Sequence, residues 1–283
     1  MTFMILAATG LLLAALERMR RLRFRSAPLL RPYFATDTVY LLTGYVVGGS
    51  LALAYITAGG ELVGTWLGLP RLAALRLPLW VSVPLALLAL DLGNYVAHWL
   101  LHRVDALWEL HKIHHSSRTL DWLATFRSHL LEQVLRRLLA PIVLIACGFP
   151  LDVVALAGAL FTSWAMLNHS NLHLRLGILE AVLVTPHLHR LHHLSRTTER
   201  NLGTVFTLWD RLRGTLVQGE PAAACAFGFP GQTDVYPQRW LWQLAEPARG
   251  VLGRWRVPER VRCPRKATAG AALAQPAGRR RAR

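Results

Sequence analysis

Charged residues are scarce in this sequence, and acidic residues are the scarcest. Only 17% of the 283 residues are charged, whereas soluble globular domains have about 25%. Hydrophobic residues make up 53% of the chain, which exceeds the roughly 45–50% of soluble domains. The lack of charge argues against an ordinary soluble domain and predicts a chain that lies largely in a lipid bilayer.

The shortage of acids leaves a net charge of +16, from 32 basic and 16 acidic residues. Such an excess would also suit a nucleic-acid partner. The arginines, however, gather at the ends of apolar runs, a placement that orients membrane helices with their positive ends in the cytoplasm. We therefore expect a membrane and no nucleic acid. These arginines are Arg18, Arg20, Arg21, Arg23, Arg25 and Arg31 near the first run, and Arg279, Arg280, Arg281 and Arg283 at the end of the chain.

Cysteine is nearly absent. Cys147, Cys225 and Cys263 lie far apart, and no two of them form a C-x-x-C pair. This distribution excludes a disulfide framework and a cysteine-based zinc ribbon.

Long apolar runs predict an all-α, polytopic membrane bundle. The predicted spans are Phe3–Leu16, Tyr33–Ala58 and Leu79–Leu101, the last of which can cross a hydrocarbon core of about 30 Å. A fourth apolar region, Leu130–Leu167, is broken at Gly148-Phe149-Pro150 and predicts a membrane hairpin that enters and leaves on one side. That hairpin would bring the polar segments before and after it to the same side of the membrane. There they are predicted to form a histidine-rich helical cap in the cytoplasm.

Four regions are expected along the chain. Residues 1–78 carry the N-terminal membrane helices, and residues 79–217 form a catalytic domain that contains the hairpin 130–167. Residues 218–262 form a segment at the membrane interface, where tryptophan and arginine anchor well. Residues 263–283 read as a disordered basic tail, since their alanine, glycine, proline and arginine cannot build a packed core.

All 12 histidines fall between residues 98 and 193. Ten of them form four groups with the spacing H-x-x-x-H or H-x-x-H-H, which places the imidazoles of each group on one helical face. The groups are His98 and His102; His111, His114 and His115; His169 and His173; and His189, His192 and His193.

Ten imidazoles exceed what one metal ion needs. Structural zinc takes four ligands and catalytic zinc usually three plus water, whereas ten ligands suit two ions with about five each. Imidazole is a good ligand for iron, and a redox site needs open positions for oxygen. We therefore predict two iron ions held by the ten histidines, which would be both the metal ligands and the catalytic residues.

Two other classes of function compete with this interpretation. A zinc-dependent membrane hydrolase would need a general base, such as the glutamate of H-E-x-x-H, and the sequence has no such motif. A metal transporter or metal-binding protein would place histidines or acids along several spans, whereas only Asp91 lies in mid-span here.

Four further side chains are candidates for support of the metal site. Asp91 and Tyr95 continue the helical stripe of His98 and His102 and are expected to orient an imidazole or tune the site. His129 and His187 fall outside the four groups, and we expect outer-sphere or substrate contacts from them. These two are not predicted as direct ligands.

The histidine motifs resemble those of the fatty acid hydroxylase/sterol desaturase superfamily of membrane enzymes. The resemblance covers roughly Asp91–Thr215. It rests on the segments Asp91–Arg103, Leu107–Ser116, Arg127–Glu132, Asn168–Asn171, Thr185–His193 and Trp209–Thr215. Within these segments, Glu132, Asn171 and Asp210 are additional candidates for residues that support the metal ligands.

The resemblance implies a non-haem di-iron centre that uses O₂ to hydroxylate or desaturate a lipid. It also implies a separate electron donor: a reductase, a ferredoxin or a cytochrome. The chain departs from the family pattern at Asn201-Leu202-Gly203, where an aromatic residue is usual in the middle, and at Arg213, where phenylalanine is common. Many bacterial relatives lack the histidine that corresponds to His173.

Overall fold

The protein is seen here in a computed structural model, which describes residues 2–26, 28, 31–44, 62, 65–66, 68, 77–141, 144, 147–194, 199–219, 227–229 and 236–252. Within these ranges the secondary structure is helical, and β-pairing is limited to isolated bridges. The predicted all-α class is therefore confirmed for the described residues.

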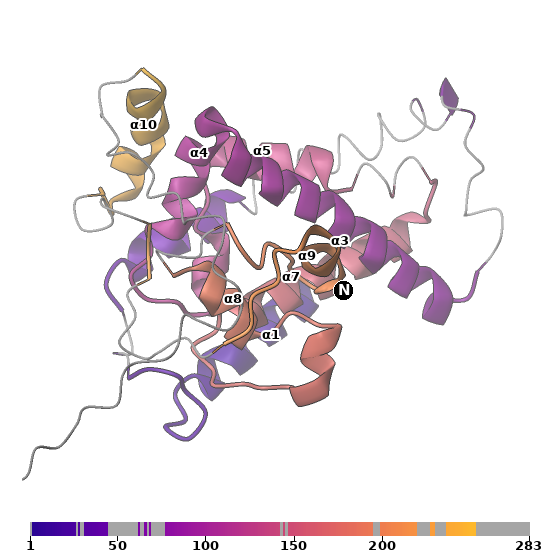
Figure 1. Ribbon diagram of the computed structural model, residues 1–283, viewed down its shortest axis with the longest axis horizontal. Helices are drawn as coiled ribbons and strands as arrows, with labels where there is room; N and C mark the ends of the chain where they lie inside the picture. Colours follow the sequence, from indigo (N-terminus) through magenta and orange to yellow (C-terminus); the bar gives the residue numbers. More distant parts are fainter. Residues whose placement is uncertain are drawn as a thin grey trace, which may run out of the picture.

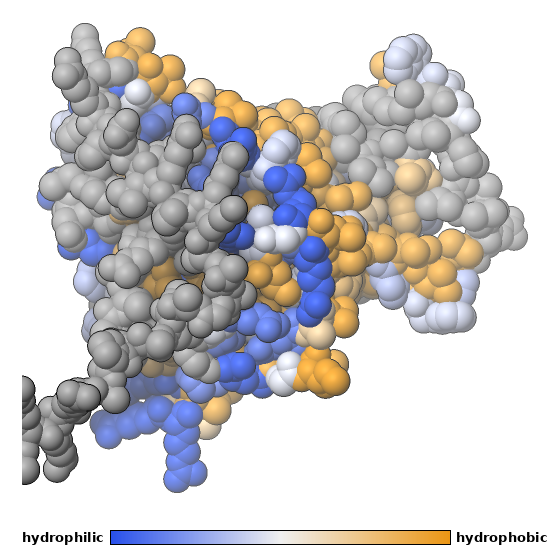
Figure 2. All heavy atoms as spheres, viewed as in Figure 1, coloured by the Kyte–Doolittle hydropathy of each residue, from blue (hydrophilic) through white to orange (hydrophobic). Residues whose placement is uncertain are grey.

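Two long apolar helices run side by side through the molecule (Figure 1). They are α3 (Leu79–Arg103) and α7 (Leu151–His169), and each is long and apolar enough to cross a membrane. Val83 and Ala86 of α3 share a core with Val153 of α7. Toward its first residues α3 exposes large apolar side chains, and Figure 2 shows apolar surface gathered at this end of the molecule. A bilayer would cover such a surface.

The shorter helix α1 (Thr2–Leu16) lies against α7. Leu13 of α1 packs with Met166 of α7, and the hydroxyls of Thr9 and Ser163 lie 3.1 Å apart. Residues 34–44 are also helical, at the start of the predicted span Tyr33–Ala58. The remainder of that span lies outside the described residues.

The structure describes part of the first half of the predicted membrane hairpin. The described helix there, α5 (Leu130–Leu139), has ten residues and carries Glu132, Gln133, Arg136 and Arg137. Four polar side chains in ten residues do not suit a membrane crossing, because each would have to leave water. The sequence-based interpretation overlooked this amphipathic pattern because leucines surround it. Among the described residues of the hairpin, the candidate span is α7, from the second half.

A glycine allows α5 to lie close to α3. A Cβ atom on Gly93 would come within 2.3 Å of the Ala140 carbonyl oxygen, which is far inside van der Waals contact. The absence of a side chain at Gly93 therefore sets the separation of these helices. It also brings the polar face of α5 to the end of α3 that carries His98 and His102.

The remaining elements are short, and one of them, α9, lies beside the middle of α3 (Figure 1). They are α4 (Asp105–His115), η2 (Trp122–Phe126), η3 (Gly177–Ala181), α8 (Pro186–His192), α9 (Leu208–Arg213) and α10 (Trp240–Val251). Helix α10 packs on α4. The predicted tail 263–283 lies outside the described residues, as do residues 220–226, 230–235 and 253–262 of the predicted segment 218–262.

Candidate metal centre

Nine of the ten predicted ligands lie together in two groups of buried imidazoles. Within each group, the candidate ligand nitrogens all lie within 4.8 Å of one another. The five-histidine group is His98, His102, His111, His115 and His192, and the four-histidine group is His114, His169, His189 and His193.

The two groups adjoin each other. The ring of His115 lies 4.7 Å from that of His192 in its own group and 4.7 Å from that of His193 in the other. The two H-x-x-H-H segments, on α4 and α8, therefore meet face to face. The predicted convergence of these segments is confirmed.

Nitrogen–nitrogen distances within the groups match a shared coordination sphere. Nε2 of His98 lies 3.1 Å from Nε2 of His111 and 3.2 Å from Nε2 of His102. In the other group, Nε2 of His169 lies 3.0 Å from Nε2 of His189. Two nitrogens bound to one ion at about 2.1 Å, and about 90° apart, are separated by about 3.0 Å. A cation between them would turn the repulsion of their lone pairs into shared coordination.

The opposite ring nitrogens hold five of the imidazoles in place. Each Nδ1 lies within hydrogen-bond distance of an oxygen acceptor, which fixes the ring proton on Nδ1 and leaves the Nε2 lone pair for a metal. The pairs are His98 with the Leu202 carbonyl (2.8 Å), His111 with Glu132 Oε1 (2.8 Å), His114 with the Arg127 carbonyl (3.2 Å), His169 with the Ala165 carbonyl (2.9 Å) and His192 with the Arg200 carbonyl (2.9 Å).

Burial keeps the imidazoles neutral. Loss of water lowers the pKa of the six proposed ligands on α4 and at α8, and lowers that of His192 to about 3. Neutral imidazole is the form that binds a metal. The Nε2 of His192 and both ring nitrogens of His115 are buried without a hydrogen-bond partner. The imidazoles are neutral, several of their nitrogens have no hydrogen-bond partner, and five of the rings are held in place through Nδ1. These properties fit a site for a pair of metal ions.

His173 is not part of either group, which corrects the predicted set of ten converging histidines to nine. Helix α7 ends at His169, so the i, i+4 relation to His173 is not helical. The backbone N–H of His173 donates to the Leu22 carbonyl at 2.6 Å, and its exposed ring stacks on Phe24. The turn at Ser170 and Asn171 therefore directs His173 to the surface.

His129 and His187 lie outside both groups. Nδ1 of His129 accepts the backbone N–H of Leu131 at 3.1 Å and caps α5, and its Nε2 lies 3.3 Å from the Leu244 carbonyl. His187 is buried on α8. Neither histidine contributes a nitrogen to the two groups.

A chain of polar contacts links the five-histidine group to the helices around it. Glu132, which holds His111, also accepts a hydrogen bond from Arg136 at 3.1 Å. Arg136 donates to Asn94 at 3.0 Å, and Asn94 donates to Thr204 at 3.0 Å. The direct contact between Glu132 and His111 supports the expected role of Glu132. Sequence reasoning missed Arg136 and Asn94. The i, i+4 pair Glu132–Arg136 was the available signal.

Asp91 and Asp210 support the predicted ligands indirectly, through a loop. Asp91 accepts the backbone N–H groups of Val205 (2.9 Å) and Phe206 (3.0 Å), and Asp210 accepts that of Leu202 (3.1 Å). They position the loop whose Leu202 carbonyl holds His98. No described contact joins Asp91 to an imidazole, so any effect of Asp91 on the predicted ligands passes through this loop.

Tyr95 and Asn171 also support loops. The hydroxyl of Tyr95 lies 3.4 Å from that of Thr215. The Asn171 amide exchanges hydrogen bonds with the backbone of Arg25, at 3.0 and 2.8 Å, and so ties the N-terminal loop to the end of α7. Neither side chain has a described contact with a predicted ligand.

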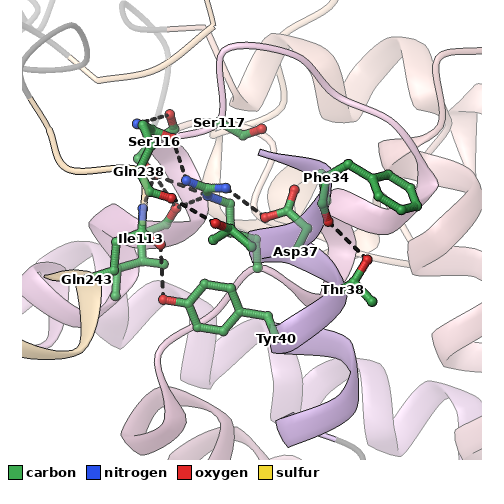
Figure 3. A network of polar contacts seen from close by, with 12 residues as sticks. Phe34, Asp37, Thr38, Tyr40, Ile113, Ser116, Ser117, Gln238 and Gln243 are labelled. Carbon is green, nitrogen blue, oxygen red and sulfur yellow. Dashed lines mark hydrogen bonds and ion pairs between the residues drawn. The ribbon is translucent and has the colours of Figure 1, made fainter. Parts of the chain in front are cut away.

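Behind α4, a buried arginine fixes the end of the ligand helix (Figure 3). Arg127 donates to the Ile113 carbonyl and to the Ser116 hydroxyl, both at 3.2 Å, and forms an ion pair with Asp37 at 2.7 Å. It also donates to the side chain of Gln238. The network therefore connects α4 to helical residues 34–44 and to the segment before α10. The motif at Arg127 was visible in the sequence, but its partners were not.

Comparison with known proteins gives a consistent result. A family described as fatty acid hydroxylase matches residues 83–215, which include all nine clustered histidines. An ornithine lipid hydroxylase from Rhizobium tropici is 33% identical over 172 residues, covering 60% of this chain and 51% of that protein. An alkylglycerol monooxygenase from Danio rerio is 31% identical over 189 residues, covering 62% of this chain and 41% of that protein.

The human alkylglycerol monooxygenase is 30% identical over 139 residues, covering 48% of this chain and 30% of that protein. The chain thus aligns with about half or less of the length of these relatives. No solved structure matches the chain significantly.

Proposed function

We propose that this chain, whose residues 83–215 belong to the fatty acid hydroxylase family, is a membrane-bound di-iron oxygenase that hydroxylates or desaturates a C–H bond of a lipid. The observation that carries the proposal is the pair of adjoining imidazole groups, with five and four members. The ornithine lipid hydroxylase and the alkylglycerol monooxygenases support a lipid as substrate.

The proposed ligands are the nine clustered histidines, without His173. When bound, two iron ions would supply activation of O₂ and removal of hydrogen from an unactivated carbon. The four-histidine group offers fewer nitrogens than the five-histidine group. We assign the exogenous ligand to its side, because an ion with four protein ligands has room for another.

The residues around the groups do the positioning. The carbonyls of Leu202 and Arg200 and the carboxylate of Glu132 hold rings whose Nε2 atoms face inward. Because all nine imidazoles are buried, bulk water is kept from the reacting carbon. The residues around the groups would orient the ligands and exclude water, while the metal would contribute the redox chemistry.

We place α3 and α7 across the bilayer and the imidazole groups on its cytoplasmic side, in a multi-pass protein. The groups lie at the ends of these helices, where Arg103 follows His102. Positive charge at helix ends favours the cytoplasm. The acyl chain or ring system of the lipid would then lie in the membrane with its reacting carbon near the interface.

Metal analysis of the purified protein tests this function. We expect about two irons per chain, and O₂-dependent modification of lipid extracts on reduction. His111→Ala and His192→Ala should each lower the iron content and abolish activity, because each removes a nitrogen from the five-histidine group. His187→Ala and His173→Ala should retain the iron, since neither side chain contributes to a group.

The competing functions give different results. A zinc-dependent hydrolase would release product without O₂ or a reductant, and a metal-binding protein would bind ions without turnover. Equal loss of iron in all four variants would show that the ligand assignment is too narrow. Lipid profiling of cells with and without the gene would identify the substrate and separate hydroxylation from desaturation.

A further inference from the structure

A basic surface lies on the loop that follows α1. Arg18, Arg20 and Arg21 are exposed there, and Arg23 is half-buried. The acid of this loop, Glu17, points inward and accepts two backbone hydrogen bonds, each of 2.9 Å. Its carboxyl group is therefore directed away from the arginines, and the outer face of the loop is positive.

This loop is attached to the segment that follows α7. Arg23 forms an antiparallel bridge with Leu172, and the Leu22 carbonyl accepts the N–H of His173 at 2.6 Å. The exposed ring of His173 consequently lies beside the arginines. The loop from Arg18 to Arg25 and His173 together are called the basic surface below.

One aromatic ring joins the basic surface to a ligand helix. Phe24 stacks on His173, with ring centroids 6.3 Å apart and an angle of 9° between the planes. The guanidinium of Arg190 lies 4.3 Å from the centroid of the same Phe24 ring. Arg190 is buried on α8, between the proposed ligands His189 and His192. A partner on this surface would therefore sit behind the helix that completes both imidazole groups.

We propose that the basic surface is the docking site for a soluble one-electron donor protein with an acidic face, of the ferredoxin or flavodoxin class. The inference rests on the proposed function, because hydroxylation requires electrons: R–H + O₂ + 2 e⁻ + 2 H⁺ → R–OH + H₂O. The C–H and O–O bonds break, a C–O bond forms, and the second oxygen atom leaves as water. The donor supplies the two electrons that the substrate does not.

The contact of the surface with Arg190 of α8, through Phe24, favours an electron donor over a lipid headgroup. The loop after α1 lies at the lower left of Figure 1, and that end of the molecule is hydrophilic in Figure 2. Large apolar side chains are exposed where α3 begins, and also at Met19 and Leu22 within the basic surface itself. Arg18, Arg20 and Arg21 are exposed, so a charged protein can approach them. Complementary charge speeds such encounters and loses its effect in salt.

Charge reversal in the iron-loaded, full-length protein tests the docking site. Arg20→Glu/Arg21→Glu is compared with Arg211→Glu/Arg239→Glu, which changes charge equally at exposed arginines elsewhere. The proteins are placed in nanodiscs of zwitterionic lipid and reduced with an acidic plant-type ferredoxin, an acidic flavodoxin or dithionite. We expect the first variant to be reduced about tenfold more slowly by both proteins at low ionic strength, with the difference shrinking in high salt. The control should stay close to wild type, and dithionite should reduce all three proteins equally.

The outcomes separate the docking site from the proposed function. If dithionite and O₂ produce no modified lipid in the wild type, the proposed function fails. If they do, but both double variants accept electrons from the proteins alike, the docking site is overturned. It is also overturned if neither acidic donor reduces the wild type, or if nanodiscs with anionic lipid protect the arginine loop from proteolysis, which would identify a lipid contact.

Discussion

At the scale of single residues, the orientation of His111 depends on one carboxylate. Glu132 holds its Nδ1 at 2.8 Å in a site from which water is excluded, and Arg136 holds Glu132 in turn. Hydrogen bonding to His111 lowers the pKa of Glu132, against the effect of burial, so the carboxylate form accepts the ring proton. An anionic acceptor also makes the imidazole a better donor to a metal.

Replacement of Glu132 should therefore weaken metal binding. We expect Glu132→Ala to lower iron affinity by roughly 10–100-fold, and Glu132→Gln to lose less, because the amide oxygen can still accept from His111. Iron retained per chain after dialysis against graded chelator measures this. Leu131→Ala, at an exposed position of the same helix, is the control. Wild-type retention in Glu132→Ala would mean that the contact does not position the ligand.

At the scale of elements, the junction of α1, η2 and the end of α7 depends on Glu17. Its carboxylate oxygen accepts the backbone N–H groups of Trp122 and Asn171, both at 2.9 Å. Burial nevertheless raises the pKa of Glu17 from 4.5 to about 7, since the two hydrogen bonds do not compensate for the loss of water. The protonated acid is thus the form that the fold favours.

This raised pKa predicts a pH dependence of stability. The contribution of Glu17 is fully present below pH 4.5 and is lost as the pH rises through about 7, and a shift of this size corresponds to about 3 kcal/mol. Glu17→Gln keeps the acceptor oxygen and cannot ionise. It should raise the melting temperature above pH 7 and flatten its pH profile between pH 5 and 8.

Thermal unfolding in detergent at several pH values measures the effect. Glu199→Gln, at an exposed acid, provides a control that should leave the profile unchanged. A lower melting temperature for Glu17→Gln at pH 8 would show that the carboxylate, and not the acid, stabilises the junction.

The main helices and the helical faces of most histidines could be predicted from sequence, because residue spacing determines the helical face as long as the helix is unbroken. Leu79–Leu101 corresponds to α3, and the H-x-x-H-H spacing placed three imidazoles of each segment in the site. The ending of α7 at His169 could not be predicted, because the turn that follows is stabilised by a distant loop at Leu22. The carbonyls of Leu202 and Arg200, which accept from His98 and His192, could not be predicted either, because every residue has a backbone carbonyl.

At the scale of the whole molecule, each imidazole group joins three helices. Each group takes ligands from α4 and α8, and α3 or α7 supplies the rest. A bound ion would therefore tie the helices to one another. A ligand that binds only the folded state stabilises it by about 2.7 kcal/mol at 100 times its Kd.

Removal of metal should accordingly lower the melting temperature. We expect a decrease of about 5–10 °C after chelation, given the usual conversion for a chain of this size. Readdition of ferrous iron under anaerobic conditions should restore it. His111→Ala should respond weakly to chelation, whereas His173→Ala should respond as the wild type does. An unchanged melting temperature after complete removal of iron would contradict this cross-linking role.

Because both groups need histidines that lie beyond α7, neither can be completed early in biosynthesis. In the proposed topology, the ribosome must first deliver α7 to the bilayer and then release α8 on the cytoplasmic side, so iron acquisition would be a late step of maturation. In iron-starved cells we therefore expect the chain to accumulate as an inserted but inactive precursor, which later iron supply could activate without new protein synthesis.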